Sequence, residues 1–373
     1  MLFVLILLIS GLSQSALAKE IAPPPKKSRS HIDLVIALDT SNSMDGLINS
    51  ARQKVWDLVN DMATAKPTPI LRVGLISFGN DGYRESGWTR IDQGLTSDLD
   101  AIYEKLMALK TNGGTEYVGR AIHTARTQMD WRRDRKSLKI IFVAGNESAD
   151  QDMEFRAVKE AGLTIEQDII VNTIYCGNDS EPESRGWREV ALRADGQFAN
   201  IARDGGAIVI NTPFDKKLNA LSAKLNKTYI GYGSRGMAKK KVQASMDMEA
   251  NSMSGSAGAA RAAAKASPLY RNEAWDIVDA VEGGSVKVEE MKRDQLPTEM
   301  QDMDPKERLA YVAKMKKKRA KIQGEIAELN KKRSAFIKKE MAKRGQSKDS
   351  AFDIAVGGAL RKQARTKGII FSK

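Results

Sequence analysis

Sulfur and imidazole side chains are scarce in this chain of 373 residues. Its one cysteine, Cys176, excludes a disulfide within the chain and any cysteine-based metal cluster. Because Cys176 ends an apolar segment, we interpret it as a buried core residue. The two histidines, His31 and His123, argue against a histidine-rich catalytic metal site. Hydrophobic residues make up 42% of the chain, which is enough for a substantial core.

Long apolar runs are lacking after the first residues, so no later segment is expected to cross a membrane. The opening apolar run of about ten residues is itself too short to span a bilayer. Small residues follow it and Ala16-Leu17-Ala18 fits a cleavage site, so residues 1–18 are predicted to be a secretory signal cleaved after Ala18. No Lys or Arg precedes the run, which leaves an uncleaved anchor as the alternative. No cysteine lies at the cleavage point, which excludes a lipoprotein anchor, and the predicted location is periplasmic or secreted.

Acidic residues are scarce in the last part of the chain. Residues 306–373 contain 21 Lys and Arg but six Asp and Glu, whereas residues 1–305 contain 39 and 41, so the net charge of +13 belongs to the tail. Three interpretations stay open: a solvated face, a surface for an anionic membrane or envelope polymer, and a nucleic-acid site. Aromatic residues do not alternate with these charges and an exported protein rarely meets nucleic acid, so we expect no nucleic-acid partner.

Residues 31–233 alternate between short apolar runs and segments with helical periodicity. Strands are predicted at 32–38, 70–78, 138–144, 169–175 and 207–210, with a short edge strand at 87–92. Helices are predicted at 46–63, 97–109, 116–130 and 213–226. This pattern indicates an α/β fold with a doubly wound, mostly parallel sheet that has helices on both faces.

The segments that flank this body differ from it in composition. Residues 19–30 contain three consecutive prolines and are predicted to form an extended linker. Residues 234–304 are rich in Ala, Gly and Ser, and we expect a linker with short elements, a flexible break at 252–258 and a strand within 284–297. Residues 305–373 are predicted to form a mainly helical C-terminal extension, a basic helical tail.

Asp304 and Pro305 predict the start of a long helix that runs to about Lys343, and a shorter helix is predicted at 352–367. Charged residues occupy three of the nine heptad core positions of the long helix, which makes a self-sufficient coiled coil doubtful. We expect a solvated helix that packs partly on the body.

Asp39, Ser41 and Ser43 form a D-x-S-x-S sequence directly after the apolar segment 32–38. They place a carboxylate and two hydroxyl groups on one turn, and such hard oxygen ligands suit Mg2+ or Ca2+ better than zinc or copper. We also expect Ser43 to cap the helix that begins near Met44. Because ligands bind at the carboxyl ends of strands in open α/β sheets, the sequence predicts a cation site at this edge.

This pattern resembles the metal-ion-dependent adhesion site of von Willebrand factor type A domains. Two more features match that family in the same order: the strand VGLISF at residues 73–78 and the loop TNGGTE at residues 111–116. The resemblance covers about residues 30–232. It implies the doubly wound sheet described above.

The resemblance also implies a ligand set. Ser41, Ser43 and Thr115 would supply hydroxyl ligands, and Asp39 would hold the ion directly or through water. The implied cofactor is Mg2+, with Ca2+ or Mn2+ as alternatives. The implied partner is a protein that offers an acidic side chain to the open coordination position of the ion.

One position departs from the pattern of the family. Its fourth strand usually ends in T-D-G, and that Asp belongs to the site, whereas this chain has Gly145 there, followed by Asn146 and Glu147. We consider Asn146 and Glu147 as replacement ligands, with a solvated loop as the alternative. A site with one anionic ligand fewer is expected to bind divalent ions more weakly. The G-N-E ending resembles a variant in bacterial exported proteins, some of which carry a basic helical tail.

The leading hypothesis is an exported binding protein that mediates metal-dependent protein–protein interaction in the bacterial envelope. The alternative is a structural or scaffolding module with a degenerate metal site, which binds an anionic envelope component through residues 306–373. We do not expect an enzyme, because the sequence has no recognisable Ser/His/Asp arrangement, Walker-type phosphate loop or H-E-x-x-H helix.

Overall fold

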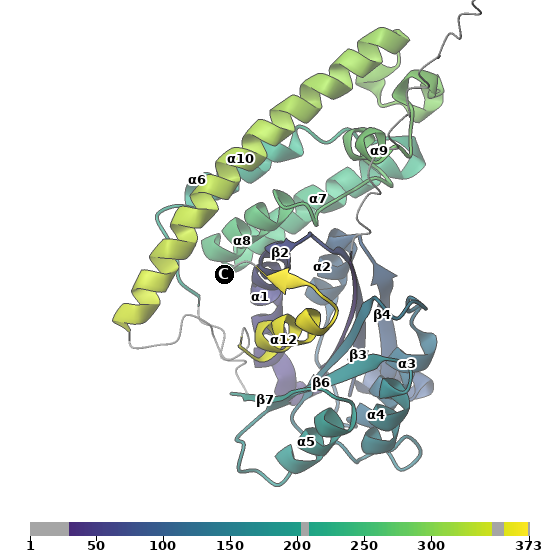
Figure 1. Cartoon of the computed structure of the whole chain (residues 1–373), viewed down its shortest axis with the longest axis vertical. Helices are drawn as coiled ribbons and strands as arrows, with labels where there is room; N and C mark the ends of the chain where they lie inside the picture. Colours follow the sequence, from purple (N-terminus) through teal and green to yellow (C-terminus); the bar gives the residue numbers. More distant parts are fainter. Residues whose placement is uncertain (1–29, 203–208, 345–353, 372–373) are drawn as a thin grey trace, which may run out of the picture.

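The computed structural model describes residues 30–202, 209–344 and 354–371. Its centre is a six-stranded sheet of order β4-β3-β1-β5-β6-β7, in which β4 is antiparallel to β3 and the other neighbours are parallel (Figure 1). The strands are β1 (His31–Asp39), β3 (Ile70–Phe78), β4 (Thr89–Thr96), β5 (Leu138–Gly145), β6 (Ile169–Cys176) and β7 (Phe198–Ile201). The predicted doubly wound, mostly parallel sheet is confirmed.

The last strand of the sheet lies earlier in the chain than predicted. The predicted strand at 207–210 falls partly outside the described residues, and Val209 and Ile210 belong to no strand. The structure instead pairs Phe198–Ile201 with β6 at the sheet edge. Three of the four residues of β7 are only partly buried or exposed, so this strand lacks the apolar run by which the inner strands were recognised.

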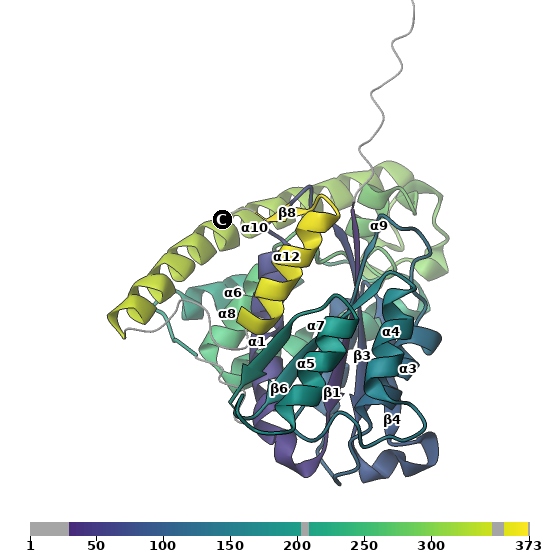
Figure 2. The ribbon, with the colours of Figure 1, turned by 60° about the horizontal axis from the view of Figure 1, so that its bottom comes forward.

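The two faces of the sheet are covered by separate sets of helices. Val35 and Ala37 of β1 pack on the side of α3 (Val118–Gln128), α4 (Ala157–Ile165) and α5 (Ser184–Arg193). Leu34 and Leu38 pack on the other side, with α1 (Asp45–Met62) and α2 (Leu99–Ala108). This alternation follows from the two-residue period of a strand, and Figure 2 shows both layers with the sheet between them.

A further helical layer covers α1 and α2 on the side away from the sheet. It consists of α6 (Asp215–Asn226), α7 (Gly233–Met253) and α8 (Gly255–Lys265), with α8 in contact with α1, α6 and α7. The residues expected to form a flexible break, 252–258, contain the junction between α7 and α8, where the Ser254 hydroxyl accepts a hydrogen bond from the Ala257 amide at 2.9 Å.

The high content of small residues in 234–304 thus reflects close helix packing and not a linker. Alanines of α8 are almost completely buried, and their small side chains let α8 lie close to three neighbouring helices. Residues 284–297 contain no strand either. They form η3 (Val288–Glu290) and η4 (Arg293–Gln295), two short 3-10 helices, and Val288 is buried in a small core with Ile277 of α9 (Ile277–Gly283).

The long helix α10 (Pro305–Lys343) lies along α6 and spans the helical layer (Figure 1). Its predicted start is confirmed by a capping box. The Asp304 carboxylate accepts a hydrogen bond from the Glu307 amide at 2.8 Å, and the Glu307 carboxylate accepts one from the Asp304 amide at 2.8 Å. One row of its residues faces the body, including the fully enclosed Ile326, while most of its lysines are exposed. The expected solvated helix that packs partly on the body is therefore confirmed.

The chain then returns to the body. After η6 (Ile354–Gly358), the helix α12 (Ala359–Thr366) lies beside β6 (Figure 2). The short strand β8 (Ile370–Phe371) follows it and pairs with β2 (Ala65–Lys66). The predicted second helix is thus present within the described residues, although its first turn is π-helical. Gln363 of α12 and Asn172 of β6 exchange two side-chain hydrogen bonds of 2.6 and 3.0 Å.

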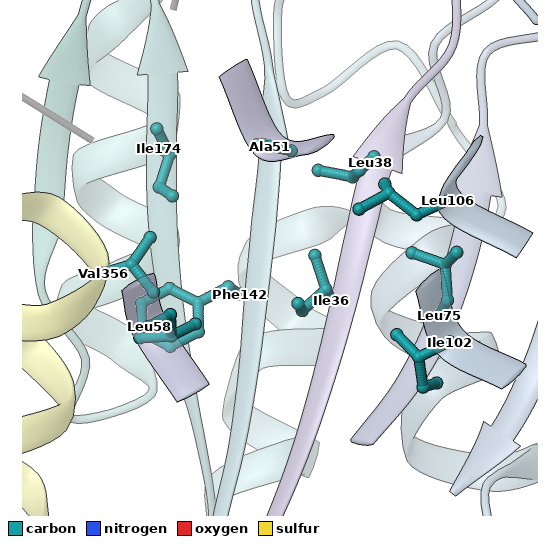
Figure 3. A pocket seen from close by; sticks show the side chains of 11 residues that line it. Ile36, Leu38, Ala51, Leu58, Leu75, Ile102, Leu106, Phe142, Ile174 and Val356 are labelled. Atoms are coloured by element: carbon teal, nitrogen blue, oxygen red, sulfur yellow. The ribbon is translucent and has the colours of Figure 1, made fainter. Parts of the chain in front are cut away.

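The core beneath these helices contains a cavity of about 30 Å³ (Figure 3). Only apolar side chains line it, among them Ile36, Phe142 and, from the returning C-terminal segment, Val356. A cavity without polar groups cannot hold a water molecule or orient a ligand, so we treat it as a packing void. Among the described residues, no helix is long and apolar enough to cross a membrane.

The predicted secretory signal at residues 1–18 lies outside the described residues, and so does most of the predicted linker at 19–30. The limits of the predicted domain, residues 31 and 233, stay predictions.

Candidate functional site

The D-x-S-x-S turn begins where β1 ends at the carboxyl edge of the sheet. Asp39 is fully buried, and its Oδ1 accepts a hydrogen bond from the Ser41 amide at 2.7 Å. The next residue ties the turn to the adjacent strand, because the amide and the hydroxyl of Thr40 donate to the Phe78 carbonyl at 2.7 and 2.8 Å. The turn is therefore held rigidly before any ligand is considered.

Three of the predicted ligands are brought together next to this turn. The hydroxyl oxygens of Ser41 and Ser43 lie 3.0 Å apart, and the Ser43 hydroxyl donates to Asn146 Oδ1 at 3.0 Å. Asn146 follows β5 and is 5% exposed, so it is part of the site and not of a solvated loop. The predicted cap is wrong: α1 begins at Asp45 without a side-chain cap, because the Ser43 hydroxyl is used by Asn146.

The loop at residues 111–116 is bound to the same turn. The Asn112 amide donates to the Thr40 carbonyl at 3.0 Å, and the Asn42 amide donates to the Gly113 carbonyl at 3.1 Å. Gly113 has a φ of +84°, and a side chain there would also collide with Asp81. This loop places the half-buried Thr115 near the turn, and Thr115 is not a helix cap, because α3 begins at Val118 after Tyr117.

The residue after Thr115 was missed by the sequence analysis. Glu116 is 2% exposed, and its carboxyl group interacts with Asp39, Ser41 and the backbone of Glu147. Gly79 lies against both residues, because a Cβ there would collide with Asp39 Oδ1 and lie 3.2 Å from Glu116 Cγ. A carboxylate directly after the predicted hydroxyl ligand was the available signal in the sequence.

Burial disfavours the ionised form of both carboxyl groups. Burial raises the pKa of Asp39 well above its ordinary value, and the negative charge of Glu116 raises it further. Burial likewise raises the pKa of Glu116. Asp39 Oδ2 and Glu116 Oε2 are both buried without a hydrogen-bond partner, which is costly for charged oxygens.

The remaining predicted ligand, Glu147, contributes differently. Its side chain is exposed, while its carbonyl accepts a hydrogen bond from Trp187 Nε1 at 2.8 Å. Trp187 is fully buried and packs against Gly145, where an added Cβ would lie 3.0 Å from the Trp187 ring and 3.2 Å from Asp39 Oδ2. The space that the family uses for an aspartate is therefore occupied by Trp187 and Asp39.

These residues fit a hard divalent cation. The donor set consists of oxygens, and two buried carboxylate oxygens have no partner of their own. In the described part of the chain, no three His, Cys, Asp or Glu side chains cluster as a metal site. Any ion here would depend on hydroxyl and amide oxygens together with the carboxylates.

The other candidate groups lie in the interior or elsewhere. Cys176 is fully buried, as predicted, and burial raises its thiol pKa. His123 of α3 lies 3.1 Å from a Glu160 carboxylate oxygen, and Glu160 also accepts from Arg126 at 2.8 Å. Cys176 and His123 therefore have structural roles, in the core and in a polar contact between α3 and α4.

Comparison with known proteins places part of this chain in a family. A profile of the von Willebrand factor type A domain matches residues 34–147, which include most of β1, the loop at 111–116 and Gly145. A search of curated proteins finds no match.

Three solved structures are reported among those similar to this chain. An aerotolerance-related membrane protein from Bacteroides fragilis, with multiple mutations to serines, is 19% identical with a TM-score of 0.33, over 47% of this chain and 94% of that one. The vWF domain of the type V pili tip protein Mfa5 from Porphyromonas gingivalis is 12% identical with a TM-score of 0.37, over 48% and 92%. Proximal thread matrix protein 1 from the mussel byssus, with a zinc-occupied MIDAS motif, is 14% identical with a TM-score of 0.36, over 47% and 43%.

These identities and TM-scores are low, so the assignment rests on the profile match and on the motifs that the structure brings together. Residues 34–147 carry the signature, and the sheet around them has the expected topology. The chain contains a von Willebrand factor type A domain.

Proposed function

We infer that the domain is a binding module that uses a divalent cation to grip an acidic side chain of a protein partner. The cation would be Mg2+, with Ca2+ and Mn2+ as alternatives. The resemblance implies Asp39, Ser41, Ser43 and Thr115 as its ligands, and Asn146 after β5 would be a further one. We assign it no reaction, and the role is binding.

The observation that carries this proposal is the unpartnered oxygen of Asp39. Oδ2 is buried without a hydrogen-bond partner while Oδ1 is held by the Ser41 amide, so one half of the carboxylate is available to a cation. When bound, the ion would attract an anionic group to a coordination position that the protein leaves open. The two serine hydroxyls and Asn146 would supply further oxygen ligands beside it.

The position of the site also supports binding to another protein. It lies at the carboxyl edge of the sheet, where β1 ends at Asp39. Together with the predicted signal at residues 1–18, this favours an exported protein that meets its partner in the periplasm or outside the cell.

Isothermal titration with Mg2+ and Mn2+ tests the cation part. Wild type should bind one ion, and Asp39→Ala should lose binding, because it removes the buried carboxylate. Asp150→Ala is the matched control, since Asp150 is an exposed carboxylate on the loop after β5 and should bind like wild type. No heat of binding for wild type, or unchanged binding by Asp39→Ala, would contradict the proposal.

The partner is tested by crosslinked capture from envelope extracts, with and without a chelator. We expect a specific protein to be captured by wild type and lost with chelator or with Asp39→Ala. Capture that persists in both cases would show that the site does not mediate the contact.

A second candidate function is supported by the exposed lysines of α10. Lys314, Lys317, Lys318 and Lys321 share one helix face and are all exposed, so this face is suited to an anionic membrane or envelope polymer. In this alternative the module is a scaffold with a degenerate metal site.

Sedimentation with vesicles that contain anionic lipid tests this alternative. Reversing all four lysines to Glu should abolish binding while Asp39→Ala leaves it unchanged, with neutral vesicles as the control. Deleting residues 306–373 is a poor test, because Ile322 and Ile326 of α10 belong to the main core. Binding that survives the four reversals would exclude this face.

A further inference from the structure

We propose that Glu116 supplies the second anionic ligand of the cation site, in place of the aspartate that the family carries at the position of Gly145. This inference rests on the proposed function, because it assumes that a cation binds beside Asp39. It assigns a ligand role to a residue of the loop at 111–116 that the resemblance does not include among the ligands.

The first argument is the place of Glu116 in the structure. Its side chain reaches the interior from the residue after Thr115, contacts Asp39 and Ser41, and is 2% exposed. The Glu116 amide is bound to Gln151 Oε1 at 3.2 Å, which orients the residue toward the turn and away from solvent. A buried glutamate is rare unless it is paired or bound to a metal.

The second argument is that this pair of carboxyl groups lacks a positive partner. Asp39 Oδ2 and Glu116 Oε2 are both buried and unpartnered. Among the described residues, no Lys, Arg or His is recorded in an ion pair with either group. A cation bound between these oxygens would supply the positive partner that the described side chains do not.

The third argument explains why the carboxylate comes from this loop. A side chain at residue 145 would meet the ring of Trp187 and the carboxyl group of Asp39, and Trp187 is held by its hydrogen bond to the Glu147 carbonyl. An aspartate at the end of β5 would therefore require Trp187 or Asp39 to shift. Glu116 has a longer side chain, and it reaches Asp39 from the neighbouring loop. The site keeps two anionic groups, on which the affinity for divalent ions depends.

The competing explanation is structural, with one proton shared by Asp39 and Glu116 and no ion bound. The two explanations differ in what charge removal does. Glu116→Gln keeps the size of the side chain and its hydrogen-bonding capacity but removes its negative charge. A shared-proton pair would tolerate this change with no consequence for cations, because the amide donates where the proton did.

The test is isothermal titration of the full chain with Mg2+ and Mn2+, together with thermal unfolding in EDTA and in excess cation. We expect Glu116→Gln to weaken cation binding about 10-fold or more and to lose most of the cation-dependent rise in Tm. In EDTA it should unfold at the same or a higher temperature than wild type, because the repulsion is gone. Asp150→Asn, which neutralises an exposed carboxylate on the loop after β5, should behave like wild type in both measurements.

Each other outcome has a defined meaning. Cation binding by wild type that is lost in Asp39→Ala but unchanged in Glu116→Gln overturns this inference and leaves the proposed function intact. Loss in Glu147→Gln alone would assign the second charge to Glu147 instead. No cation binding by wild type overturns both.

If Glu116→Gln does not fold, Glu116→Asp replaces it. This variant keeps the charge but shortens the side chain by one methylene, so the carboxylate should not reach the ion. We expect weaker cation binding with an unchanged melt in EDTA, and binding equal to wild type would overturn the inference.

Discussion

At the scale of single residues, Gly145 decides more than its size suggests. It lies at the end of β5, level with the end of β1, and its missing side chain leaves room for Trp187 and for the Asp39 carboxyl group. Restoring an aspartate at this position would therefore not restore a standard site. It would force Trp187 or Asp39 to move.

Because Trp187 or Asp39 would have to move, Gly145→Asp should destabilise the protein without strengthening cation binding. We expect a loss of about 1–3 kcal/mol in the free energy of unfolding, the usual cost of overpacking a core. Urea denaturation measures it, with Gly94→Asp as control because a Cβ at Gly94 meets no atom within 4 Å. A stable Gly145→Asp variant with tighter cation binding would contradict the packing argument.

A second residue-scale effect concerns acid stability. Burial disfavours the ionised form of Asp247, but Lys265 and Arg261 outweigh it and lower its pKa to about 2. Lys265 Nζ lies 2.6 Å from Asp247 Oδ2, and Arg261 Nε lies 2.5 Å from Oδ1. Because the folded pKa lies below the unfolded value of 3.8, the contribution is complete above pH 4 and is lost as the pH falls toward 2.

Asp247→Asn should therefore flatten the pH dependence of stability in this window. The difference in pKa corresponds to about 2 kcal/mol at neutral pH, which wild type should lose on acidification and the variant should lack. Urea denaturation at a series of pH values between 2 and 6 tests this. Equal slopes for both proteins would show that Asp247 does not titrate as its contacts indicate.

At the scale of secondary-structure elements, α10 is attached by arginines as well as by apolar side chains. Arg319 donates to Asp276 Oδ2 at 2.8 Å, to Asp279 Oδ1 at 2.7 Å and to the Thr228 carbonyl at 2.7 Å. Arg333, two helical repeats further on, donates to Asp215 Oδ1 at 3.1 Å. These arginines are two of the three charged heptad positions that argued against a coiled coil, and both form ion pairs with acidic residues of the body.

Arg319→Ala should strongly weaken this attachment. Asp276 is fully buried, so removing its partner leaves an uncompensated buried charge, at a cost of about 3–5 kcal/mol. Lys317→Ala, on the exposed face of the same helix, is the control and should change stability by less than about 0.5 kcal/mol. Chemical denaturation compares the two, and similar small effects would mean that α10 is held by its apolar row alone.

At the scale of the whole molecule, the predicted domain (residues 31–233) and the helices that follow it share one core. Residues of α1, α2, α8, α10 and α12 belong to the same hydrophobic cluster. Arg261 of α8 also donates to Asp100 of α2 at 2.7 Å and lies over the ring of Trp56 at 4.7 Å. The helices after residue 233 therefore complete the core of the predicted domain.

A chain limited to residues 31–233, the predicted domain limits, should consequently be unstable by itself. It would expose Trp56 and leave the buried Asp100 without Arg261, which together predict a loss of at least about 3 kcal/mol and binding of a hydrophobic dye. Thermal unfolding compares it with the full chain. If the short chain unfolds at the same temperature, the extension is a separate unit.

Much of the sheet could be predicted from the sequence, because inner strands are continuous apolar runs. The strand at 70–78 was predicted to the residue. Edge strand β7 was not recognised, since it is too polar to show a clear period, and the alanine-rich α8 was expected only as a short element of a linker. Similarly, Ser41, Ser43 and Asn146 were predicted in the site, whereas Glu116 was not.

The sequence by itself determined the domain family and the oxygen-rich turn at Asp39, because both depend on local order along the chain. Only the tertiary structure decided that Glu116 lies beside Asp39, that Trp187 fills the space at Gly145 and that the alanine-rich segment is core. These facts depend on contacts between segments far apart in the chain. Such contacts arise from burial and steric fit, which no local pattern records.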